Sequence, residues 1–237
     1  MLILVGAFLV SLIPSILLFL WMKKQSGENE EYKKTCDKAM IQGFVSVIWL
    51  TLVCLILALS ESLLKISRFG PIWQEAYHTF IVVVLPEEIV KMFLMCRFLK
   101  KMEYRYSWRD IVAFQIIINL GFSMIEDLVY AFITTPGQML VRGVFIMHGG
   151  YGYIMGYFLA KAKATKNKMY YIPASLIPLL LHGLYDFTLD DKVSALSDLL
   201  LFTPLIMVIA DVVLLVRMFM FFKKTKNQEL YTAPVEN

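Results

Sequence analysis

Seven apolar stretches, each about 20 residues long, constrain the fold of this chain more than any other feature of its sequence. In lipid the backbone must satisfy its own hydrogen bonds, so a stretch of this length crosses the bilayer as a helix. The sequence therefore predicts an all-α, polytopic membrane helix bundle with about seven transmembrane helices. The stretches lie at roughly 2–22, 40–60, 76–98, 111–133, 141–160, 169–189 and 199–222.

The composition excludes the main soluble classes. The 237 residues are 59% hydrophobic and 18% charged, whereas soluble domains are about 45–50% apolar and about 25% charged. This excess argues against a soluble enzyme, a secreted disulfide scaffold and a nucleic-acid-binding protein. The polar connections are too short to fold separately, so we expect one integral membrane domain over 1–237, with the lipid bilayer around it.

The basic residues predict the orientation of the bundle. Most of the 23 lysines and arginines follow the first, third, fifth and seventh stretches. Loops rich in Lys and Arg stay on the cytoplasmic side of a membrane. We therefore expect the N-terminus outside and the C-terminus inside, with a cytoplasmic tail at 223–237. The loops expected outside hold only Lys65, Arg68, Arg142 and Lys192.

Ionisable side chains concentrate in four of the apolar stretches, between residues 76 and 189, and the last stretch adds Asp211. Charged groups inside a membrane are energetically costly, so they mark functional sites by default. We count their depth from the nearest basic residue expected on the cytoplasmic side, at a rise of about 1.5 Å per residue. They lie at similar depths of about 18–25 Å, in the outer half of a core about 30 Å thick. The residues used for this estimate are Glu88, Glu126, His148 and His182.

The spacing within two stretches predicts local contacts. Lys91 is four residues after Glu87 and three after Glu88, so one ammonium can reach both carboxylates. Two adjacent carboxylates in a low dielectric are not expected to ionise together unless Lys91 or a metal compensates. His182 and Asp186 are one turn apart, so the acid can orient the imidazole. Pro86 removes a backbone hydrogen bond just before Glu87, which predicts a bent or opened helix there.

Other polar residues and glycines in these stretches have simpler interpretations. His78 lies near the outer end of its stretch and is expected at the interface. Asp127 is interpreted either as a neighbour of Glu126 or as part of the site, and Asp211 as a packing or paired residue. The GxxxG spacing of Gly152 and Gly156 predicts a close contact between helices.

Four motifs stand in order along the chain, and together they carry a family resemblance. They are EExxK from Glu87 to Lys91, FxxxED from Phe122 to Asp127, a single histidine, His148, and HGLYD from His182 to Asp186. This pattern resembles the PrsW family of intramembrane proteases. That family belongs to a larger group with the CAAX prenyl-proteases and the bacteriocin-immunity membrane proteins.

The resemblance implies an intramembrane peptidase in the plasma membrane of a Gram-positive bacterium. Its substrate would be a single-pass anti-sigma factor, cut first near the extracytoplasmic face and then by a second intramembrane protease. This cleavage belongs to envelope-stress signalling. The catalytic residues that the resemblance implies are Glu87, Glu88, Glu126, His148, His182 and Asp186.

Two mechanisms remain open from the residues alone. In a glutamate-type reaction, Glu87 acts as general base, aided by Glu126 or His148, and His182 stabilises the oxyanion. In a metal-type reaction, Glu88 is a base or supports the ligands, although the HExxH spacing of many zinc proteases is absent. The ligands of a zinc-like ion would then be Glu87, Glu126, His148 and His182.

Two other functions share the same sequence features. A proton- or cation-coupled transporter also places Glu, Lys and His inside the membrane, although transporters are more often longer and show repeated broken helices. A non-catalytic immunity or scaffold protein could use the same fold. Cleavage of a single-pass membrane substrate by the purified protein would separate the peptidase from both.

Overall fold

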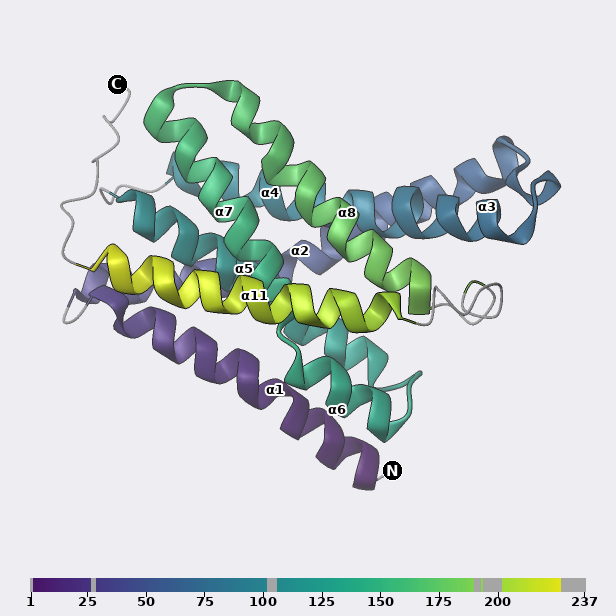
Figure 1. Cartoon of the computed structure of the whole chain (residues 1–237), viewed down its shortest axis with the longest axis horizontal. Helices are drawn as coiled ribbons and strands as arrows, with labels where there is room; N and C mark the ends of the chain where they lie inside the picture. Colours follow the sequence, from purple (N-terminus) through teal and green to yellow (C-terminus); the bar gives the residue numbers. More distant parts are fainter. Residues whose placement is uncertain (1, 27–28, 102–105, 190–192, 194–201, 227–237) are drawn as a thin grey trace.

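The computed structural model describes residues 2–26, 29–101, 106–189, 193 and 202–226. Every element in these ranges is helical, which confirms the predicted all-α class (Figure 1). Residues 227–237 of the expected cytoplasmic tail, and 199–201 of the last apolar stretch, lie outside the described ranges. The α-helices are α1 (Leu2–Lys23), α2 (Glu30–Leu63), α3 (Pro71–Tyr77), α4 (Leu85–Lys101), α5 (Trp108–Tyr130), α6 (Pro136–Val144), α7 (Met147–Thr165), α8 (Tyr171–Leu189) and α11 (Thr203–Lys224).

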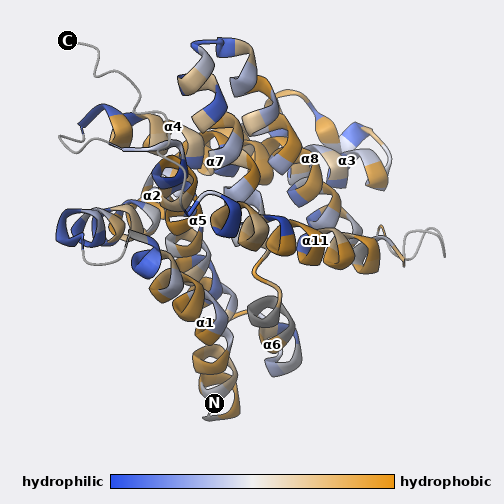
Figure 2. Ribbon diagram, turned by 60° about the vertical axis from the view of Figure 1, so that its left-hand side comes forward, coloured by the Kyte–Doolittle hydropathy of each residue, from blue (hydrophilic) through white to orange (hydrophobic). Residues whose placement is uncertain are grey.

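Five helical segments of the described chain are long and apolar enough to cross a membrane. Figure 2 shows α1 and α11 coloured as hydrophobic along most of their length. The third and fifth expected stretches are not among the five; α4 carries Glu87, Glu88 and Lys91, which lower its hydropathy. The exact number of seven and the orientation of the termini stay predictions. The five segments are Ile3–Lys23, Glu30–Leu63, Trp108–Tyr130, Lys168–Leu189 and Leu205–Lys224.

The structure divides the expected helix at 141–160 into two helices. α6 ends at Val144 and α7 begins at Met147. Ile146, between them, has φ −83° and ψ 54°, which is not a helical conformation. α6 packs along α1, whereas α7 packs against α5 (Figure 1). The break therefore places the first turn of α7 inside the bundle, where His148 and Gly149 are buried.

The third expected helix corresponds to three successive helical segments, α3, η3 (His78–Val84) and α4, which form one longer rod. α3 leads into η3, which is a π-helical segment, and then into α4. The N–H of Leu85 donates to the carbonyl of Phe80, five residues earlier. Pro86, which has no N–H to donate, follows directly after this segment at the second position of α4. The predicted irregularity next to Pro86 is therefore a π-segment, a geometry that is frequent at functional sites.

The centre of the bundle is formed by α5, which packs against α2 and α7. In its most apolar window, 72% of the residues are buried, against at most 33% in the other spanning segments. Gly152 and Gly156 of α7 make this packing close, as their spacing predicts. An added Cβ at either position would lie 2.9 Å from the Cα of Ile116 or of Val112, respectively.

Candidate active site

The first turn of α4 brings two glutamates and a lysine together in the interior. Glu87, Glu88 and Lys91 are exposed by 4%, 0% and 0%. The ammonium Nζ of Lys91 lies 2.6 Å from Oε1 of Glu88 and 3.8 Å from Oε2 of Glu87. Lys91 also faces the ring of Phe122 on α5, with Nζ 4.4 Å from the ring centroid. The predicted contact of Lys91 with both acids is thus present, and Glu88 is its closer partner.

His182 of α8 joins this group from the opposite side. Its Nδ1 lies 3.0 Å from Oε1 of Glu88 and 3.7 Å from Oε2 of Glu87. Its Nε2 lies 3.2 Å from Oδ2 of Asp186, one turn further along α8. Both ring nitrogens therefore face carboxylates, and Asp186 fixes the orientation of the imidazole as its spacing predicts. Gly183 beside His182 packs directly on Phe80 of η3, which holds α8 against the rod.

The second histidine completes the group from α5 and α7. Nε2 of His148 lies 2.8 Å from Oε2 of Glu126. The ring centroids of His148 and His182 are 5.0 Å apart, with their planes nearly perpendicular. The six residues expected to be catalytic therefore meet in one place, although they come from four helices. They are Glu87, Glu88, Glu126, His148, His182 and Asp186.

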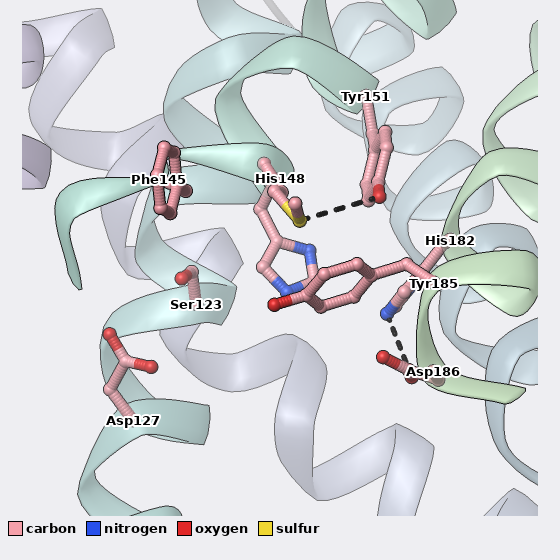
Figure 3. A pocket seen from close by; sticks show the side chains of 9 residues that line it. Ser123, Asp127, Phe145, His148, Tyr151, His182, Tyr185 and Asp186 are labelled. Atoms are coloured by element: carbon pink, nitrogen blue, oxygen red, sulfur yellow. Dashed lines mark hydrogen bonds and ion pairs between the residues drawn. The ribbon is translucent and has the colours of Figure 1, made fainter. Parts of the chain in front are cut away.

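A small cavity opens beside the two histidines. Its volume of about 30 Å³ has room for about two water molecules. Figure 3 shows Ser123 and Asp127 of α5 on one side of this cavity, and His182 and Asp186 on the other. Asp127 is buried and forms part of the wall, so the structure places it beside the site. The lining residues are Ser123, Asp127, Phe145, Met147, His148, Tyr151, His182, Tyr185 and Asp186.

Tyr151 is a residue of the site to which the sequence assigned no role. Its ring stacks on His182 at a centroid distance of 5.3 Å and stands edge-on to His148 at 5.9 Å. It follows His148 by three residues on α7, so both share one face of the helix. This spacing is the sequence feature that could have indicated Tyr151 as a site residue. A tyrosine within an aromatic-rich helix, however, is also typical of a packing residue.

Two other polar positions lie apart from the group. His78 pairs with Glu61 of α2 through Nδ1 and Oε1 at 2.7 Å, in an exposed position that agrees with an interfacial role. Asp211 of α11 is 2% exposed and lies against Gly150 of α7. Neither carboxylate oxygen of Asp211 has a hydrogen-bond partner among the described residues, so of the two interpretations, packing and pairing, the contact with Gly150 agrees with packing.

The donor atoms of the group fit a divalent metal ion. One donor atom from each of Glu88, His148 and His182 can be chosen so that all lie within 4.8 Å of one another. Two buried atoms that could bind a metal ion, Oε2 of Glu88 and Nδ1 of His148, have no hydrogen-bond partner in the described chain. Each histidine also has a carboxylate on Nε2, the arrangement that orients metal-binding histidines. The carboxylate in this set is that of Glu88, whereas the sequence suggested Glu87 and Glu126.

The local charges also favour a cation. Glu87, Glu88 and Asp186 surround His182, and Lys91 is the ammonium that faces this group in the described chain. Buried carboxylates in such excess are costly unless they are protonated or bind a cation. Two histidines with glutamate form a ligand set that suits zinc. The site therefore has both the donor types and the charge that a zinc-like ion requires.

Comparison with known proteins agrees with this site. A family model described as "PrsW family intramembrane metalloprotease" matches residues 38–218. Protease PrsW of Clostridioides difficile (strain 630) is 31% identical over 193 residues, 77% of this chain and 78% of that protein. The corresponding protein of Oceanobacillus iheyensis is 33% identical over 135 residues, 55% of this chain and 63% of that protein. That of Geobacillus kaustophilus is 29% identical over 165 residues, 68% and 73% of the two chains. No solved structure matches the chain.

The matched region contains α4, α5, α7 and α8, which supply the six grouped residues. The family match confirms the expected peptidase, and with it a protein substrate. Together with the five apolar helices, it supports a multi-pass membrane protein. A metal-dependent reaction agrees with the description of the family. The chain belongs to the PrsW family of intramembrane metalloproteases.

Proposed function

We propose that this membrane peptidase makes the first cut in a single-pass anti-sigma factor, close to the extracytoplasmic face of the plasma membrane. The observation that carries the proposal is the buried group of Glu87, Glu88, His148 and His182 beside a water-sized cavity. A second intramembrane protease would then cut the remaining membrane stub and release the stress signal. The similar proteins come from Gram-positive bacteria, which supports the same cellular setting.

The helix ends support a cut near the outer face. Glu87 and Glu88 lie in the first turn of α4, and Lys100 and Lys101 lie in its last turn. His148 likewise lies in the first turn of α7, a helix of 19 residues with Lys163 in its last turn. A helix of this length spans about 28 Å. The site thus lies at the end of α7 remote from the basic residues expected in the cytoplasm, and near the middle of the rod that α3, η3 and α4 form.

The arrangement supports distinct roles for the two glutamates. Glu88, His148 and His182 would hold the metal ion, while Glu126 and Asp186 orient the histidines. When bound, such an ion polarises a carbonyl and makes water more acidic. Lys91 neutralises part of the charge on Glu88 and leaves its Oε2 for the ion.

Glu87 would act as the general base. Its buried Oε2 has no hydrogen-bond partner in the described chain and lies 3.7 Å from His182. It takes a proton from a water molecule, whose oxygen attacks the peptide carbonyl carbon. The carbon–nitrogen bond then breaks, and Glu87 passes the proton to the leaving amine. The products are a new carboxylate and a new amine, and Glu87 is regenerated.

The test uses the purified protein reconstituted in lipid vesicles with a panel of single-pass anti-sigma factors. We expect cleavage by the zinc-loaded protein and none by Glu87→Ala, with mass spectrometry locating the cut near the extracytoplasmic boundary. A cut on the cytoplasmic side would contradict the proposed depth. Cleavage that persists in protein shown to be free of metal would favour the glutamate-type mechanism.

A further inference from the structure

Peptide hydrolysis requires hydrogen-bond donors for the carbonyl oxygen, which gains negative charge during attack. The grouped residues supply few donors for this purpose. Both ring nitrogens of His182 face carboxylates, at 3.0 and 3.2 Å. Lys91 is held by Glu88 and Phe122, and Nε2 of His148 is held by Glu126. Hydrogen-bond donors that act together with the proposed ion would therefore come from another part of the cavity wall.

The N-terminus of α7 is one source of donors. α7 begins at Met147, and the preceding Ile146 provides no side-chain cap. The N–H groups of Gly149 and Gly150 both donate to the carbonyl of Ile146, so those of Met147 and His148 precede the first hydrogen bonds of the helix. The first amides of a helix point outward and carry its positive dipole end, which attracts anions.

This helix end reaches the cavity. His148, in the first turn, is 7% exposed and lines it. Met147 and Phe145 line the same cavity, so the helix end itself forms part of the wall.

The hydroxyl of Tyr151 is the other source and an observation independent of the helix end, because this side chain is 3% exposed, lines the cavity and has only a thioether as its hydrogen-bond partner among the described residues. Side chains on a helix lean toward its N-terminus, so Tyr151 reaches back over the first turn. Its hydroxyl lies 3.8 Å from the sulfur of Met147 (Figure 3). A thioether is a weak acceptor, so this O–H can turn to a stronger acceptor at little cost. Stacking on His182 fixes the ring while leaving the hydroxyl at the same end of α7 as the first amides.

We propose that the hydroxyl of Tyr151 and the first amides of α7 bind the carbonyl oxygen of the scissile peptide bond. The inference rests on the proposed peptidase mechanism and adds a substrate-binding position to it. When water attacks the carbonyl carbon, the π electron pair moves to the oxygen, which accepts hydrogen bonds from these donors. The pair returns to re-form the carbonyl as the amine leaves, so the donors undergo no net change.

Tyr151→Phe tests the proposal, because it removes the hydroxyl and keeps the ring that stacks on His182. Loss of one oxyanion donor typically lowers kcat by a factor of about 100–1,000. We expect this loss in the zinc-loaded, reconstituted protein, with KM and zinc content unchanged. Tyr153→Phe is the matched control, since Tyr153 lies two residues on and packs on Phe221 of α11 at 5.9 Å. It should retain kcat within about twofold.

Binding measurements provide a readout that simple loss of packing would not give. A peptide phosphinate, whose anionic oxygen imitates the oxyanion, should bind Tyr151→Phe about 100-fold more weakly than it binds the wild type, in step with kcat. An uncleaved substrate peptide should bind both proteins equally. Equal weakening of both ligands, or a wild-type kcat in Tyr151→Phe, would overturn the inference. Failure of the wild-type protein to cleave any substrate would instead refute the proposed function.

Discussion

Two histidine–glutamate pairs in this protein have almost the same geometry and very different surroundings. His148 and Glu126 meet at 2.8 Å with side chains 9% and 13% exposed. His78 and Glu61 meet at 2.7 Å with side chains 51% and 33% exposed. The same contact is therefore found once in the interior and once at the surface. Residue type and distance alone do not define the site.

The elements that converge on each pair explain the difference. The inner pair lies beside His182, Tyr151 and Phe122, and these rings bury it in the interior. The outer pair joins α2 to η3 at the edge of an open, polar pocket of about 400 Å³. In Figure 1 the ends of α2 and α3 project from the bundle near this pocket. Charges interact several times more strongly in the interior than in water, so only the inner pair is suited to polarise a substrate or hold an ion.

The largest difference between the two regions should appear in catalysis. Glu87→Gln removes the proposed base and is expected to lower kcat by a factor of about 1,000. Initial rates of cleavage in vesicles would measure this effect. Glu61→Gln, the same change in the outer region, serves as the matched control and should retain the wild-type rate. A Glu87→Gln rate within tenfold of the wild type would contradict the assignment of Glu87.

The second largest difference is expected in zinc affinity, which should depend on the inner histidine–glutamate pair and not on the outer one. Glu126→Gln keeps the size of the side chain but removes the carboxylate that orients His148. We expect zinc affinity to fall by a factor of about 10–100, as for other residues that support metal-binding histidines. Competition with a chromogenic chelator would measure it in metal-free protein. If Glu61→Gln weakens zinc binding as much as Glu126→Gln does, the proposed inner site is wrong.

Stability should also respond differently in the two regions. At Gly152, an added Cβ would meet the backbone of Ile116 at 2.9 Å, whereas at Gly70 it would meet no atom within 4 Å. Gly152→Ala should therefore lower the free energy of unfolding by about 1–3 kcal/mol, because α5 and α7 must separate. Gly70→Ala, at the N-cap of α3, should change it by less than about 1 kcal/mol. Unfolding titrations in detergent micelles would compare them, and equal effects would contradict the close packing of α7 on α5.

The smallest effect is expected at His78. His78→Ala should change the cleavage rate by less than about twofold and the unfolding free energy by less than about 1 kcal/mol, because exposed ion pairs contribute little. The same substitution at His148 should abolish cleavage. Parallel rate measurements on both variants would check the prediction. A large loss of activity in His78→Ala would give the outer pair a role that its exposure does not suggest.

The sequence predicts contacts within a helix better than contacts between helices. The spacing of Glu88 and Lys91, and of His182 and Asp186, leads directly to the observed ion pairs. Depth counting also predicts that the polar groups of four helices meet, which the structure confirms. It does not predict that Glu88 rather than Glu87 meets His182 most closely. That choice depends on the rotation of each helix about its own axis, which interhelical packing sets.

Breaks in the regular α-helices are harder to predict from the sequence. The apolar stretch at 141–160 continues through the end of α6, so hydropathy alone gives no signal at Ile146. The first turn of α7, and with it the position of Tyr151 in the cavity, depends on this break. Pro86 does indicate an irregularity, but its form as a π-segment over seven residues depends on contacts with α2 and α8.

The π-segment also sets the rotational phase between the two halves of the α3–α4 rod. A π-helical turn accommodates one residue more than an α-helical turn, since its hydrogen bonds span five residues. If η3 became α-helical while keeping all seven of its residues, one half of the rod would turn by about 100° relative to the other. Phe80 would then leave Gly183, or Glu88 would leave His182. The same sequence wound as an unbroken α-helix would thus lose the site while every one of its side chains remained in the chain.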